Sequence, residues 1–234
     1  MNLLLVSAIS LQIHFAFSSQ LAGVVMLDTI TFTKMLFKFE YTVVKFDLFY
    51  PVGDTHKNFG KVAKQLVIED AILMAQVQVR DYGEKTNMDL ANNYGVQMDK
   101  VTAPITILYS SSGGEIKEIR RLNGDFTEDD LRDFISSETG LYLQRPGCTR
   151  ELDELSRHYL AADAQRRSQI LDLVQSIRDS QVYLKLMQGI EKHGEEYLQD
   201  QLIKTQNMIQ QKMSETSKKK LMEKINVINS FKIK

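Results

Sequence analysis

VVKFDLFYPVGDTHKNFGKVAKQL, residues 43–66, decides the fold of the first half of the chain. Residues 43–48 are mainly apolar and partly β-branched, a pattern typical of a buried strand. The residues after the loop place apolar side chains at helical spacing: Phe59, Val62, Ala63 and Leu66. The stretch therefore predicts a strand, a loop and a helix in that order.

Similar patterns follow along the chain. Residues 72–79 and 105–109 are short and rich in β-branched residues, which again favours buried strands. A short helix is expected at residues 87–94, with Gly95 at its C-terminal stop. Residues 110–114 are expected to form a hairpin turn, with Gly113 and Gly114 at its tip rather than in a phosphate-binding loop, leading into an edge strand at residues 116–121.

A last helix of this half begins after Thr127, the expected N-cap, with acidic residues in its positive first turn (Glu128, Asp129 and Asp130). Its buried face is expected to be Leu131, Phe134 and Ile135. An extended segment is expected at residues 29–32. The order β-α-β-α-β-β-α predicts an α/β domain with a mixed sheet flanked by helices.

The second half has a different character. All three prolines lie at or before residue 146, and only four of the twenty aromatic residues follow Cys148. Apolar residues at helical spacing form stripes there: Leu152, Leu155 and Tyr159; Ile170, Leu171, Val174 and Ile177; Tyr183, Met187 and Ile190; Leu221, Ile225 and Ile228. Each stripe is too short for a stable isolated helix, so we expect a small all-α domain. The predicted organisation is a leader at residues 1–19, an α/β domain at 20–140, a linker at 141–147 and a helical domain at 148–234.

The N-terminus is apolar from Leu3 to Phe17 and ends in Ser18 and Ser19. The run is shorter than the about 20 residues of a membrane span, which favours a secretory signal peptide. No lysine or arginine precedes it, and a buried N-terminal segment is the alternative. No later stretch is apolar enough to span a bilayer.

Composition excludes several classes of function. The 234 residues are 43% hydrophobic and 25% charged, with a formal net charge of −1. This balance gives no field that would attract nucleic acid or an anionic membrane, so neither is an expected partner. The four histidines have no paired spacing, so we expect no metal site, and no motif predicts a cofactor.

Cys148 is the single cysteine, so the chain cannot form the two-thiol site of a disulfide-exchanging enzyme. In a secretory compartment one cysteine is buried and inert, or paired between chains, and burial is the simpler interpretation. Lys218, Lys219 and Lys220 form the one basic run, interpreted as a solvated face or as a docking surface for an acidic partner.

The loop at residues 49–53 carries more information. In a thioredoxin-like sheet this position holds the redox dithiol, activated by the helix N-terminus. Here it contains no sulfur and presents Phe49, Tyr50, Pro51 and Val52. The two rings either form an exposed patch for protein contact or pack inward.

Pro104 directly precedes the strand at residues 105–109, where thioredoxin-like folds place a cis-proline beside the loop. We therefore expect a cis peptide bond at Pro104. The nearby backbone would either pair with an extended client segment or form a turn without a ligand.

These motifs resemble the endoplasmic reticulum protein 29 family, redox-inactive relatives of protein disulfide isomerase. The similarity lies in residues 28–32 (DTITF), 44–47 (VKFD), 50–53 (YPVG) and 81–85 (DYGEK), and continues through 141–148 into 221–231. It covers essentially the whole chain after the leader, in order.

The resemblance implies a homodimer of thioredoxin-like domains in the lumen of the endoplasmic reticulum. It implies a dimer interface at Gly23, Val25, Asp28 and Lys38, and client contact at Asp47 and Tyr50 beside the aromatic loop. Val52 stands where the family often has a second tyrosine, which removes a ring and a hydroxyl group.

The end of the sequence departs from the family. Members usually finish with a Lys-Glu-Glu-Leu-type retention tetrapeptide, whereas residues 231–234 read FKIK. A truncated sequence, retention through a partner and export are the three explanations.

The leading hypothesis is a non-catalytic chaperone and escort for secretory client proteins, without disulfide exchange. One alternative is a structural dimeric adaptor whose helical domain recruits other chaperones. A less favoured one is a thiol-disulfide enzyme that acts through Cys148 alone.

Overall fold

The computed structural model describes residues 21–98 and 103–231. The expected leader at residues 1–19 lies outside them. The chain divides into two compact units with a break between Thr139 and Gly140, and each is described by itself.

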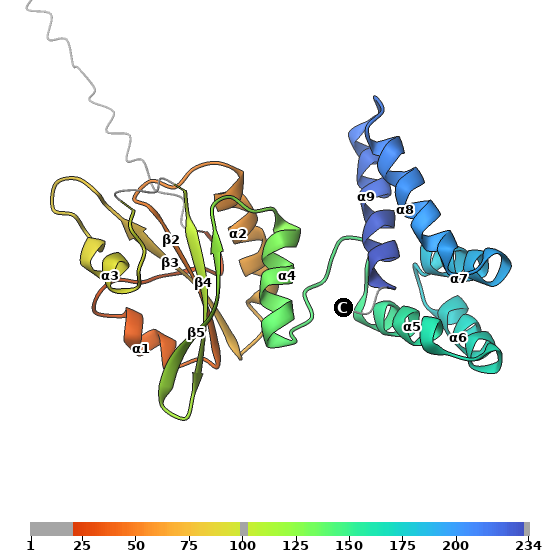
Figure 1. Ribbon diagram of the computed structural model, residues 1–234, viewed down its shortest axis with the longest axis horizontal. Coiled ribbons are helices and arrows are strands. Elements are labelled where there is room, and N and C mark those ends of the chain that lie inside the picture. Colours follow the sequence, from red (N-terminus) through yellow and green to blue (C-terminus); the bar gives the residue numbers. More distant parts are fainter. Residues whose placement is uncertain (1–20, 99–102, 232–234) are drawn as a thin grey trace, which may run out of the picture. The chain divides into compact units, whose positions relative to one another are not determined.

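The first unit is an α/β domain whose sheet has five strands in the part of the chain described (Figure 1). The strands are β1 (Val25–Met26), β2 (Tyr41–Leu48), β3 (Ile72–Val79), β4 (Ile105–Ser112) and β5 (Glu115–Asn123). The helices are α1 (Phe32–Leu36), α2 (Asp54–Leu66), α3 (Met88–Asn93) and α4 (Glu128–Thr139). The predicted alternation of strands and helices is confirmed.

The strand order is β1-β3-β2-β4-β5, in which β1, β3 and β2 are parallel and β4 and β5 are antiparallel to their neighbours. In the central register Val44 lies opposite Ala75 on one side and Ile107 on the other. This mixed sheet is the thioredoxin-like arrangement predicted from the sequence.

Side chains alternate between the two faces of the sheet along β2. Val44 and Phe46 join the core cluster that contains Phe32 of α1. Lys45 points the other way, and its Nζ lies 5.3 Å from the ring centroid of Phe59 in α2. Figure 1 shows α1 and α3 on one face and α2 and α4 on the other.

The expectation of an extended segment at residues 29–32 is wrong, because these residues turn into α1. The Asp28 carboxylate accepts hydrogen bonds from the backbone N–H groups of Ile30 (3.0 Å) and Thr31 (2.9 Å) and from the Thr31 hydroxyl (2.7 Å). These bonds lower the pKa of Asp28 and satisfy donors at the helix start. The Phe32 ring then enters the core, 4.5 Å from the Tyr94 ring between centroids.

The expected cis bond at Pro104 is also wrong, since no peptide bond in the described residues is cis. Pro104 continues directly into β4, and its carbonyl accepts the Gly124 N–H at 2.9 Å. A trans bond suits this extended path and is the isomer that the X-Pro bond favours by about 0.5–1 kcal/mol.

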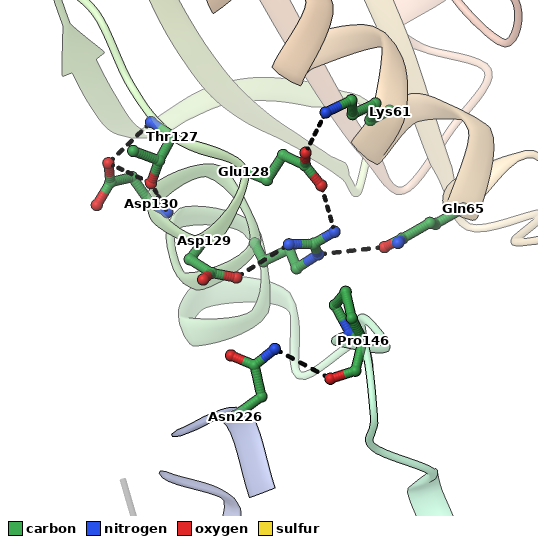
Figure 2. Close-up of polar contacts among 9 residues, drawn as sticks. Lys61, Gln65, Thr127, Glu128, Asp129, Asp130, Pro146 and Asn226 are labelled. Atoms are coloured by element: carbon green, nitrogen blue, oxygen red, sulfur yellow. Dashed lines mark hydrogen bonds and ion pairs between the residues drawn. The ribbon is translucent and has the colours of Figure 1, made fainter. Parts of the chain in front are cut away.

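A group of ion pairs joins α4 to α2 (Figure 2). Arg132, 3% exposed, donates to Glu128 at 2.8 Å and to Asp129 at 2.9 Å. Lys61 of α2 donates to the same Glu128 at 2.7 Å, and Arg132 also reaches Gln65 at 3.4 Å. The acidic first turn of α4 therefore stabilises the helix start and also holds two helices together.

The Thr127 cap is confirmed by a reciprocal pair that Figure 2 also shows. The Thr127 hydroxyl accepts the Asp130 N–H at 3.2 Å, and the Asp130 carboxylate accepts the Thr127 N–H at 2.9 Å. This is the capping-box geometry with aspartate in place of glutamate.

The second unit is helical throughout its described elements: α5 (Arg150–Ala161), α6 (Ala164–Ser176), α7 (Gln181–His193), α8 (Glu196–Ile209) and α9 (Glu215–Ser230). Three of these helices start at a side-chain cap, which is Thr149, Asp163 or Ser214. The predicted stripes supply the core, with Tyr159, Val174, Tyr183 and Ile228 fully buried. Only α8 had no predicted stripe; it pairs with α9, and its Leu198 and Leu202 join the same core.

The start of this unit is fixed to its last helix. The Asn226 side chain of α9 donates to the Pro146 carbonyl at 3.0 Å (Figure 2), and the Ser156 and Ser230 hydroxyls lie 3.3 Å apart. No helix among the described residues has the length and apolarity that crossing a bilayer requires.

Candidate functional site

The loop between β2 and α2 is an aromatic surface. Phe49 is partly buried, whereas Tyr50 is 58% and Val52 85% exposed. The Phe49 and Tyr50 rings meet edge to face with 4.8 Å between centroids. The alternative in which both rings pack inward is therefore not what the structure has, because Tyr50 faces solvent.

Arg80, just after β3, extends this surface. Its guanidinium carbon lies 3.8 Å from the Phe49 ring centroid and 5.5 Å from that of Tyr82, which is 57% exposed. Cation–π contact holds the Phe49 ring in place. We call Phe49, Tyr50, Arg80 and Tyr82 the aromatic surface.

The sequence prediction missed Arg80 and Tyr82, because the pairing of β2 with β3 brings them to the loop and no local pattern specifies that pairing. Strands β2 and β3 are parallel, with Leu48 in register with Val79. Because the carboxyl ends of neighbouring parallel strands meet at one sheet edge, the residues that follow both strands are brought together.

Beneath the loop lies a buried ion pair that the sequence prediction also missed. Lys45 is 0% exposed, and its Nζ lies 2.6 Å from the Asp47 carboxylate and 3.2 Å from Nδ1 of His56 in the first turn of α2. Asp47 also accepts the Leu48 N–H at 2.8 Å. The ion pair lies within β2, and the contact of Lys45 with His56 links the strand before the loop to the helix after it.

Lys45 is flanked by polar neighbours across the sheet. Gln76 of β3 and Thr106 of β4 are its register partners, and they are 1% and 0% exposed. Burial lowers the pKa of Lys45, and Asp47 opposes this shift. The expected client contact Asp47 is itself only 7% exposed, and its carboxylate bonds to Lys45 and to the Leu48 N–H within β2.

Cys148 lies in the helical unit, not in the loop. It is 2% exposed, and burial raises the pKa of its thiol to about 12. Tyr183 and Tyr142 both donate to the buried Asp153 beside it, the latter at 2.9 Å. A buried, protonated thiol is a poor nucleophile, which argues against catalysis through this residue.

The four expected dimer residues, Gly23, Val25, Asp28 and Lys38, are all exposed. They lie within one segment that contains β1 at the edge of the sheet. Exposed apolar side chains share the segment: Met26 (38%), Ile30 (73%) and Phe37 (49%). Gly23 also has a local reason for its identity, since a Cβ atom there would lie 2.7 Å from Val67.

No cluster of histidine, cysteine, aspartate or glutamate in the described part of the chain has the arrangement of a metal site. The fold and the loop together define a class: a thioredoxin-like domain without a redox dithiol, followed by a helical domain.

Comparison with known families identifies the class further. Residues 19–146 match the family described as "ERp29, N-terminal domain", and residues 147–231 match "Endoplasmic reticulum protein ERp29, C-terminal domain". The chain therefore belongs to the ERp29 family, and this membership implies a location in the endoplasmic reticulum.

Individual relatives are more distant. The chain is 29% identical over 223 residues to "Protein windbeutel" of Drosophila melanogaster, covering 90% of this chain and 85% of that protein. Among solved structures it is similar to Chlamydomonas reinhardtii thioredoxin f2, at 19% identity and a TM-score of 0.40, over 51% of this chain and all of that one. A thioredoxin mutant from Halobacterium salinarum has 20% identity and a TM-score of 0.37, over 51% and 94%.

Proposed function

We propose that the protein is a non-catalytic chaperone and escort of the endoplasmic reticulum lumen. It binds exposed apolar segments of secretory client proteins and assists their folding and export without disulfide exchange. Membership of the ERp29 family, with its similarity to windbeutel, supports this class of function.

The observation that carries the proposal is the exposure of Tyr50. Leaving a large aromatic side chain in water is unfavourable, and clustered exposed aromatic groups are typical of protein contact sites. The rings sit where a thioredoxin-like enzyme holds its thiols. Arg80 packs on the Phe49 ring, and the contact of Lys45 with His56 links the strand before the loop to the helix after it. The surface is therefore presented by a stable frame.

The test is suppression of aggregation of a heat-denatured client such as citrate synthase. Tyr50→Ala should weaken suppression several-fold without changing the circular dichroism spectrum. Ile68→Ala is the matched control, because Ile68 is an apolar side chain 84% exposed in the turn that follows α2, outside the aromatic surface. Equal activity of Tyr50→Ala and wild type would contradict the role of the loop and favour the adaptor alternative.

We also propose that the chain forms a homodimer through the segment of β1. Three exposed apolar residues beside an open sheet edge support this assignment. Val25→Asp should shift the protein to a monomer in sedimentation velocity, whereas Ile203→Asp in α8 should not. An unchanged sedimentation coefficient for Val25→Asp would refute this interface.

Catalysis through Cys148 is the remaining rival, and the burial of its sulfur opposes it. In an insulin-reduction assay wild type and Cys148→Ser should both equal the blank. Turnover by wild type that Cys148→Ser abolishes would establish an enzyme.

A further inference from the structure

An open surface pocket of about 200 Å³ lies between helices α5 and α6 of the second unit. Glu151, Glu154, Leu155 and His158 of α5 line it, together with Leu173 of α6 and Ile177 just after it. This volume is below the about 300–1,000 Å³ of a small-molecule site. It suits a single long side chain.

One wall of the pocket is aliphatic. Leu155, Leu173 and Ile177 form it, and Leu173 is 50% exposed. A leucine this exposed on a helix gains contact area when an apolar chain lies against it. The wall therefore favours an occupant with a hydrocarbon stem.

The rim of the pocket contains two acids, Glu151 and Glu154, and one histidine, His158. Glu151 has no ion pair with any residue in the described ranges, and Glu154 has only a loose one, 3.6 Å from Arg150. The last turn of α6 contains no basic residue, so its negative end offsets the positive end of α5, where Glu151 lies in the first turn. The nearest basic residue after α6, Arg178, does not neutralise these acids, because its ion pair is with Asp179, at 3.7 Å, and its side chain is nearly fully exposed. The rim therefore favours a cation.

We propose that this pocket binds an arginine side chain on an exposed, basic-apolar segment of a partner protein. The methylene stem packs on the aliphatic wall, while the guanidinium group bonds to the carboxylates of Glu151 and Glu154. Arginine fits better than lysine because its planar fork can contact both acids at once. The site goes beyond the proposed function, because it is independent of the aromatic surface.

The experiment uses the full chain with labelled leucine and isoleucine methyl groups. The probe is the peptide Gly-Ser-Leu-Arg-Leu-Ser-Gly. Its binding is followed by NMR through the chemical shifts of the labelled methyl groups. Its matched control replaces arginine with citrulline, which keeps the shape and removes the charge. The methyl signals of Leu155, Leu173 and Ile177 should shift with the arginine peptide only.

Variants then test whether the carboxylates of Glu151 and Glu154 bind the arginine side chain. Glu151→Gln combined with Glu154→Gln should raise the dissociation constant roughly threefold to tenfold, the range expected for two exposed ion pairs. Glu196→Gln combined with Glu215→Gln removes two first-turn acids from α8 and α9 and should have no such effect. Leu173→Gln should weaken binding through the wall.

Unchanged core methyl signals, such as that of Ile170, confirm that each variant is folded. Tyr50→Ala should bind the peptide normally, which separates this site from the aromatic surface. Equal shifts with the citrulline peptide, equal effects of the two double variants, shifts at other methyl groups only, or no binding would each overturn the proposal.

Discussion

Raising the pH should destabilise the helical unit, mainly through the buried thiol of Cys148. Burial holds the pKa of this thiol at about 12 in the folded protein, whereas an unfolded cysteine has a value of about 8.5. The folded state therefore keeps the proton where the unfolded chain has lost it. A group with a raised folded pKa contributes stability below the unfolded pKa, and that stability is lost as the pH rises toward the folded pKa.

The magnitude follows from these two values. Between them the free energy of unfolding falls by about 1.4 kcal/mol per pH unit. From pH 7.5 to pH 9.5 the loss from Cys148 is about 1.4 kcal/mol, because most of the change begins above pH 8.5. Buried tyrosines such as Tyr183 also have a raised pKa, and they add a smaller loss that starts nearer pH 10.

The assay is urea unfolding at pH 7.5 and 9.5 in reducing buffer, followed by circular dichroism at the helical signal. Cys148→Ala is the matched variant, because it removes the thiol and retains every tyrosine. The stability difference between wild type and variant should change by about 1.4 kcal/mol between the two pH values, in favour of the variant.

Alkylation gives a second measurement of the same property. At pH 8 a thiol with a pKa near 12 is about one ten-thousandth ionised, against about a quarter for a free cysteine. Iodoacetamide should therefore label Cys148 more than a thousandfold faster in urea than in the native protein. A pH-independent stability difference, or native labelling at the unfolded rate, would refute the assigned burial.

Three further outcomes are expected. Lys45→Met should lower the free energy of unfolding by about 3–5 kcal/mol in urea titrations, since Asp47 is left as a buried charge without its partner; a loss below about 1 kcal/mol would contradict the pairing. Gly189→Ala should cost about 1–3 kcal/mol, because its Cβ would lie 2.0 Å from the Tyr197 ring, and adding Tyr197→Ala should relieve that clash in thermal melts. Val52→Tyr should strengthen client binding roughly twofold to tenfold by calorimetry, since the side chain is 85% exposed and a ring there joins the aromatic surface; unchanged affinity would place the client elsewhere.

The fold was largely predictable because its patterns are local. Strand patterns, helical spacing and the Thr127 cap each depend on only a few neighbouring residues. The elements they predict between β2 and α4 occur at the expected places in the chain. The prediction for residues 29–32 failed because it also relied on local composition. Their β-branched residues favour a strand, but the Asp28 side chain bonds to the following backbone and starts a helix instead. A side-chain bond to the backbone overrode propensity there.

The site was predictable only in part. The loop could be located, since it lies between a strand and a helix in one continuous stretch. The support of Phe49 by Arg80 depends on a parallel pairing between β2 and β3 that no local pattern specifies. The charge of Lys45 within an apolar run was a visible anomaly, with Asp47 two residues later on the same face, and this is the signal that could have predicted the buried pair.

The burial of Cys148 also has a consequence for synthesis. The core that encloses its sulfur includes Tyr183 from α7 and Phe231 at the end of α9, and Asn226 closes the same unit onto Pro146. The ribosome adds these residues well after it has added Cys148. In the lumen of the endoplasmic reticulum proposed above, the thiol is open to mispairing until the last helix has been synthesised. On that proposal, slowing the synthesis of residues 149–231 should increase disulfide-linked by-products.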